Sequence, residues 1–98
     1  MTSEQERMCL VSLNKICCDH FDKDEFSLNG KKESAVCLDK VQGKWNVYES
    51  EKNSYNDLLL FDNIVEAALD FLRRLSAASE YGNIKDKFLA SIIAQKKA

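Results

Sequence analysis

The chain has 98 residues, of which 45% are hydrophobic and 31% are charged. These proportions are typical of a single folded domain and exclude a disordered chain. Residues 1–72 hold 14 acidic and 8 basic residues, a balance of −6, whereas residues 73–98 hold 6 basic and 2 acidic residues, a balance of +4. This acidic body argues against a nucleic-acid binder with a broad basic face and favours a basic protein partner.

The first 28 residues are expected to form a helix and an acidic loop. Ser3 and Glu6 have the spacing of a capping box, which predicts a helix from Glu4 to about Cys18. The acidic residues of the loop are Asp19, Asp22, Asp24 and Glu25. Phe21 and Phe26 are expected to anchor this loop to the core, before a turn at Asn29-Gly30.

Three antiparallel strands are expected next, over residues 34–41, 44–50 and 55–61. Gln42-Gly43 provides a short hairpin connection, since glycine accepts a positive φ angle. Residues 51–54 form the second turn, where Asn53 tolerates the left-handed region. The run Leu58-Leu59-Leu60 indicates a strand partly buried on both faces, with helices covering one of them.

Two helices are expected to complete the chain. Asp62 is a suitable N-cap for a helix with apolar residues at helical spacing from Ile64 to Leu75. Asn83, with Asp86 three residues later, predicts the start of the last helix. The expected fold is therefore one α+β domain over residues 1–98, with a three-stranded antiparallel β-meander packed against helices in the order α-β-β-β-α-α.

Catalytic and metal sites are poorly supported by the sequence. The single histidine, His20, lies three residues after Cys17, but no oxyanion-hole sequence accompanies this pair. A zinc site built from Cys17, Cys18 and His20 would have only one knuckle, with Cys37 completing it from a strand, and the acidic loop lacks the central glycine of an EF-hand. We therefore expect a non-enzyme with reduced thiols, no metal and no cofactor.

Aromatic residues on the expected strands could form either a core or a binding surface. We expect Trp45 to pack in the core and Tyr48 and Tyr55 to be half-exposed cross-strand neighbours. The acids beside them, Glu49, Glu51 and Asp57, disfavour stacking on single-stranded nucleic acid. Tyrosines flanked by acids suit a protein interface instead.

The middle of the chain resembles a family of small bacterial immunity proteins that accompany polymorphic toxins, including toxins of contact-dependent growth inhibition systems. The resemblance covers about a third of the chain and lies in these segments: GKWNVY at 43–48, SEKN at 50–53, YNDL at 55–58, FD at 61–62 and EA at 66–67. Lys52-Asn53 departs from the Arg-Gly usual in this turn. The first helix and the segment after Gly82 lie outside the matched pattern.

The resemblance implies a cytoplasmic protein that binds one cognate toxin one-to-one and blocks it. Many such toxins are nucleases, whose active sites are basic because they hold phosphate. An acidic surface would compete for such a site. The candidate toxin-binding residues form an acidic-loop group and a strand group, and the sequence does not choose between them: Asp19, Asp22, Asp24 and Glu25; Tyr48, Glu49, Glu51, Tyr55 and Asp57.

A second interpretation is a non-catalytic structural or regulatory module that homodimerises. The edge strands of a meander are available for pairing with another chain. The basic C-terminal helix could also contact the acidic body of a second copy. Neither interpretation involves nucleic acid as a partner. A membrane is not expected as a partner either, since no apolar run approaches the length of a membrane span.

Overall fold

The computed structural model describes residues 2–28, 30–52 and 54–97. Its elements, in chain order, are α1 (Ser3–His20), β1 (Phe26–Ser27), β2 (Ala35–Val41), β3 (Lys44–Glu51), β4 (Ser54–Phe61), α2 (Ile64–Leu75) and α3 (Ala78–Lys97). The α+β class is confirmed. Along the described ranges, no helix is long and apolar enough to cross a membrane.

The sheet has four strands in the order β1-β2-β3-β4, so the expected three-stranded antiparallel meander is wrong. The additional strand, β1, runs parallel to β2 and pairs Phe26 with Val36. The remaining pairs are antiparallel, as expected. The two residues of β1 lie in the segment that was expected to be a loop. They pair with residues of β2 that lie ten positions later in the chain.

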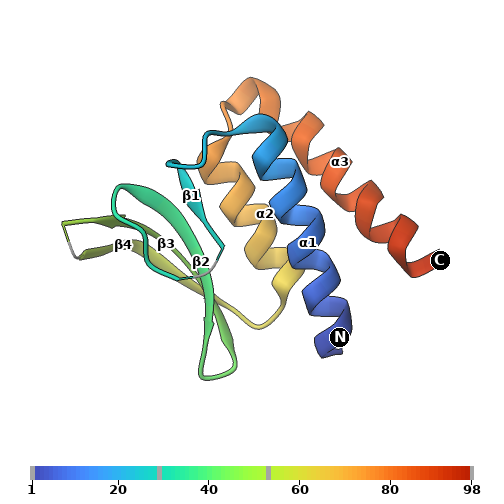
Figure 1. Cartoon of the computed structure of the whole chain (residues 1–98), viewed down its shortest axis with the longest axis horizontal. Helices are drawn as coiled ribbons and strands as arrows, with labels where there is room; N and C mark the ends of the chain where they lie inside the picture. The colour runs from blue at the N-terminus through green and yellow to red at the C-terminus, as the bar shows by residue number, and fades with distance from the viewer. Residues whose placement is uncertain (1, 29, 53, 98) are drawn as a thin grey trace.

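The three helices lie on one side of the sheet, and α3 is the outermost (Figure 1). α2 contacts β2, β3 and β4 as well as both other helices, so it joins the sheet to the helical layer. The main core lies between these layers and includes Leu13, Leu38, Val47, Phe71 and Phe88, each with no exposed surface. Phe26 is buried in this core and Phe21 packs against it, as expected for the anchors of the acidic loop.

The tight turns follow local sequence signals. Gln42 and Gly43 have φ angles of 52° and 80°, the combination of a type I′ hairpin turn, which confirms the expected connection. In the next turn Lys52 has a φ angle of 49°. The expected roles of Asn29 and Asn53 lie outside the described residues.

The helix starts differ from the expected ones. The capping box of α1 is formed by Thr2 and Gln5 rather than by Ser3 and Glu6, one residue earlier. Asn63, not Asp62, caps α2, accepting hydrogen bonds from the N–H groups of Val65 at 2.7 Å and Glu66 at 3.2 Å. In both cases two adjacent side chains have suitable capping chemistry, so the sequence alone left one residue of ambiguity.

The last helix begins at Ala78 and passes through Gly82 and Asn83 without a break, so the expected start at Asn83 is wrong. A glycine inside a helix costs about 1 kcal/mol relative to alanine, which burial of the helix can offset. Here Ile84 and Phe88 are buried in the core and hold this face of the helix in place.

The two faces of the sheet differ in what covers them. Trp45 and Val47 of β3 point toward the helices and are buried in the main core. Tyr48 points to the other face, which we call the open face, where it forms a small cluster with Ala35 and Cys37. Tyr48 is only 1% exposed, so the expectation that it is half-exposed is wrong, whereas Tyr55 is 56% exposed.

The expected burial of β4 on both faces is also wrong. Leu58, Leu59 and Leu60 are 46%, 47% and 59% exposed. β4 is an edge strand, and its neighbour in the sheet is β3 alone among the described strands. Because one edge of β4 has no neighbouring strand, β3 is the only strand that covers its side chains among the described residues.

Candidate protein-binding site

A groove of about 610 Å³ lies where β2 begins, β3 ends, β4 begins and α2 ends. Four carboxylates line it, from three parts of the chain: Glu25, Glu49, Glu51 and Asp57. The guanidinium of Arg74, near the end of α2, completes the wall. We call this the acidic groove, and an adjoining hollow of about 520 Å³ shares Glu49, Asp57 and Arg74 with it.

The position of Glu25 depends on backbone hydrogen bonds at the end of the acidic loop. The N–H of Glu25 donates to the carbonyl of Asp22 at 3.0 Å, and the carbonyl of Glu25 accepts from the N–H of Val36 at 2.9 Å. The second bond ties the loop to the beginning of β2. As a result, one residue of the expected acidic-loop group joins three of the expected strand group.

The positions of the other three carboxylates follow from β3, β4 and a bulge between them. Glu49 and Glu51 are two residues apart on β3 and therefore share a face with each other and with Val47. The pairing of β3 with β4 shifts between Val47 and Glu49, and Asp57 has a φ angle of 51° at this shift. A residue in the left-handed region at such a shift is typical of a bulge, and aspartate tolerates this conformation better than most residues.

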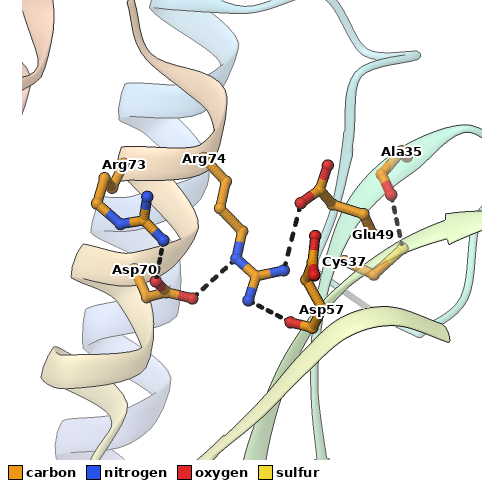
Figure 2. A network of polar contacts seen from close by, with 7 residues as sticks. All are labelled: Ala35, Cys37, Glu49, Asp57, Asp70, Arg73 and Arg74. Carbon is orange, nitrogen blue, oxygen red and sulfur yellow. Dashed lines mark hydrogen bonds and ion pairs between the residues drawn. The ribbon is translucent and has the colours of Figure 1, made fainter. Parts of the chain in front are cut away.

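Arg74 crosses from α2 to the sheet and connects the two layers, as Figure 2 shows. Its Nε donates to Asp70 at 2.9 Å, and its Nη2 donates to the backbone carbonyl of Asp57. Its Nη1 lies 3.6 Å from Glu49, beyond ideal hydrogen-bond length. The side chain is only 5% exposed, so this cation is held by anions in a largely water-free position.

Two buried polar atoms of residues beside the acidic groove lack hydrogen-bond partners among the described residues. They are Nη1 of Arg74 and the hydroxyl of Ser50, which is 2% exposed. Buried polar groups are nearly always satisfied in folded proteins, so such exceptions require a reason. Nη1 of Arg74 has the Glu49 carboxylate 3.6 Å away, whereas Ser50 lies on the open face, beside its strand neighbours Ala35 and Tyr55.

The charge around the acidic groove is negative. Two guanidinium groups and five carboxylates lie around the groove, which gives a formal net charge of −3. The carboxylates are those of Glu25, Glu49, Glu51, Asp57 and Asp70. Arg73 lies beside Asp70, whose hydrogen bond raises the pKa of the Arg73 guanidinium above its ordinary value. The net negative charge around the groove is available to a cationic partner.

The structure separates the rest of the predicted binding residues from this groove. Asp19 lies in the last turn of α1, and Asp22 and Asp24 are exposed in the loop, where Asp24 pairs with Lys32 at 3.7 Å. None of these three lines the acidic groove. Tyr48 and Tyr55 lie on the open face of the sheet, with ring centroids 4.7 Å apart.

Sequence reasoning missed Asp70 and Arg74. The only signal available was their spacing of four residues, which places an acid and a base on the same face of a helix. That pattern is usual for a surface pair, and it does not indicate that Arg74 is buried and reaches β4.

Cys17 does not have the properties of a nucleophile. Its side chain is completely buried, and this burial raises the pKa of the thiol to about 12. A reactive cysteine needs a lowered pKa and solvent access. All four cysteines are thiols, of which Cys18 is exposed, and within the described ranges no group of three or more His, Cys, Asp or Glu side chains is arranged to hold a metal ion.

Comparison of the chain with family models, curated proteins and solved structures found no match. The resemblance to immunity proteins therefore depends on the segments quoted above.

Proposed function

We propose that this chain is an inhibitor protein that binds a basic toxin domain through the acidic groove and blocks it. The toxin class is the one that the resemblance to immunity proteins implies, with a nuclease as the leading candidate. The observation that carries the proposal is the grouping of Glu25, Glu49, Glu51 and Asp57 around one groove.

The groove has the chemistry that a basic partner requires. Lysine or arginine side chains of the toxin would pair with the exposed carboxylates of Glu25 and Glu51.

Inhibition would follow from competition for positive charge. The basic residues of a nuclease active site hold phosphate, so residues that pair with carboxylates of the groove cannot hold RNA or DNA at the same time. The negative balance of the groove would also steer a basic domain toward it and accelerate association at low ionic strength.

Charge reversal at the groove tests this proposal. The variant Glu25→Lys/Glu51→Lys reverses two exposed carboxylates that hold no ion pair among the described residues, so the fold should be retained. We expect it to weaken binding to the toxin domain, for which the product of the gene directly upstream is the first candidate, by well over 1 kcal/mol, about tenfold or more in Kd.

The acidic loop provides a matched control. Asp19→Lys/Asp22→Lys makes the same change in net charge at exposed positions outside the groove. This variant should change Kd, measured by titration calorimetry, by much less than the groove variant. Equal losses of affinity in the two variants would mean that binding depends on net charge and not on the groove.

A further inference from the structure

The unpaired edge of β4 carries an apolar run that the free protein leaves uncovered. Leu58, Leu59 and Leu60 are all about half exposed. Natural edge strands are usually protected by charged residues, proline or bulges. Residues 58–61 contain no charge and no proline, and the bulge lies before them at Asp57.

The side chains of this run point to both faces of the sheet. Leu60 pairs with Asn46 and faces the open side, as does Leu58 two residues away. Leu59 pairs with Val47 and faces the helices, yet it remains 47% exposed. A partner lying on the open face would cover Leu58 and Leu60 and leave Leu59 exposed. A strand beside β4 would contact all three, so the exposure pattern favours strand addition.

We propose that β4 pairs antiparallel with β4 of a second copy of this chain, across a two-fold axis that passes beside Leu59. In this register Leu59 lies opposite its own counterpart and Leu58 lies opposite Leu60, so each leucine of the run meets a leucine. Shifting the axis to Leu58 or Leu60 would place leucines opposite asparagine or aspartate. The sequence of the run is therefore self-complementary in one register.

Charge is compatible with this pairing. Asp57 of one copy lies opposite Phe61 of the other, and Asn56 lies opposite Asp62, so no two carboxylates are directly opposed. On the open face, the paired leucines continue an apolar surface that includes Val41 and Tyr55, which are 53% and 56% exposed. The two sheets would form one continuous sheet with all helices on the same side.

This inference does not depend on the proposed function. The pairing involves residues 56–62, which include Asp57 of the acidic groove, whereas Glu25, Glu49 and Glu51 lie outside it. A failure of dimerisation would leave toxin binding open, and a failure of toxin binding would leave dimerisation open.

Analytical ultracentrifugation over a range of protein concentrations tests the pairing. The wild-type protein should sediment with twice the 11.2 kDa mass of one chain. Leu59→Lys and Leu60→Lys should each sediment as monomers with unchanged circular dichroism, because both positions are exposed in the single chain. Val11→Lys is a matched control, since Val11 is 59% exposed, like Leu60, but lies on α1. It should remain a dimer.

Cross-linking with a short bis-maleimide tests the register. In a Cys18→Ser background, which removes the exposed native thiol, Leu59→Cys should cross-link efficiently because opposed Cβ atoms lie about 5 Å apart. Tyr55→Cys should not, because its two copies would lie about 26 Å apart along the strands. A monomeric wild-type protein, a dimer unaffected by the leucine variants, or preferential cross-linking at position 55 would overturn the proposal.

Discussion

Tyr48 places its ring on the open face of the sheet and its hydroxyl on a carboxylate. The hydroxyl donates to Asp39 at 2.8 Å, and Asp39 also accepts from the side-chain amide of Asn46 at 3.2 Å. Burial and the nearby Asp39 carboxylate both raise the pKa of the Tyr48 phenol, so the hydroxyl remains a donor at high pH. A tyrosine that forms such a bond contributes to stability and is not available as an interface residue in the single chain.

Tyr48→Phe should lower the free energy of unfolding by about 1 to 2 kcal/mol, because it removes a hydrogen bond to a charged acceptor. Urea denaturation followed by circular dichroism measures this loss. Tyr55→Phe is the control, since its exposed ring packs against Tyr48 at a tilt of 59°, and it should stay within about 0.5 kcal/mol of wild type. Equal effects of the two substitutions would show that the Asp39 bond contributes nothing.

Glu6 connects α1 to the hairpin of β2 and β3. Its carboxylate accepts from Lys40 Nζ at 3.0 Å and from Trp45 Nε1 at 3.1 Å. The hydrogen bond from Lys40 is the main reason that the pKa of Glu6 lies below its ordinary value of 4.5, with Trp45 contributing and burial opposing. The ionised form is therefore more stable in the folded protein than in the unfolded chain.

Glu6→Gln should cost about 1 kcal/mol of unfolding free energy at pH 7. Because the folded-state pKa is the lower one, this stabilisation is present above pH 4.5 and is lost as the pH falls through the folded-state value. Urea titrations at pH 7 and pH 3 should show the difference between variant and wild type shrinking at the lower pH. Glu4→Gln, whose only ion pair among the described residues is with Arg7, should cost less than about 0.5 kcal/mol at both.

At the level of elements, Arg74 fastens α2 to β4. It shares Asp70 with Arg73, and the two arginines lie at similar distances, 2.9 Å and 2.8 Å, from that carboxylate. Their exposures differ greatly, at 5% for the side chain of Arg74 and 58% for that of Arg73. The same partner therefore binds one buried and one exposed cation.

Arg74→Met should lower the free energy of unfolding by about 3 kcal/mol, since it leaves Asp70 and the Asp57 carbonyl without a buried donor. Arg73→Met should cost less than about 1 kcal/mol, because exposed ion pairs contribute little. Thermal or urea denaturation of both variants provides the comparison. Similar losses would mean that burial does not distinguish the two arginines.

The elements that the sequence predicted well are those with local signals. Gln42-Gly43 between apolar strands predicted the hairpin, and the spacing of Ile64, Ala68 and Leu72 predicted α2. β1 was missed because its two residues gain their structure from pairing with β2. β4 was misjudged because a leucine run usually indicates burial, whereas exposure also depends on whether a neighbouring strand exists. The local sequence of β4 does not show whether a second strand lies beside it.

At the level of the whole molecule, the site was predicted only in part. Charge counting indicated an acidic surface, and three of the predicted strand residues, Glu49, Glu51 and Asp57, do line one groove. The sequence could not show that Glu25 joins them while Asp19 does not, because a backbone bond to Val36 decides this. Nor could it show a buried cation in the wall, since a helical Asp70–Arg74 pair has the same spacing whether it is buried or exposed.

The charge distribution and the uncovered strand point to two adjoining surfaces. The acidic groove lies where β3 and α2 end and β4 begins, and the leucine run starts directly after Asp57 of that groove. Under the two proposals, a dimer joined through β4 would present two acidic grooves, each with Glu25 and Glu51 uncovered by the pairing.

The most direct test is co-purification of this protein with the product of the gene directly upstream of its own, with RNA degradation assayed in parallel. We predict a complex with one toxin domain per chain that stops degradation and that weakens as ionic strength rises, because exposed charge pairs are screened by salt. Absence of a complex, or a complex in which the toxin remains active, would contradict the account.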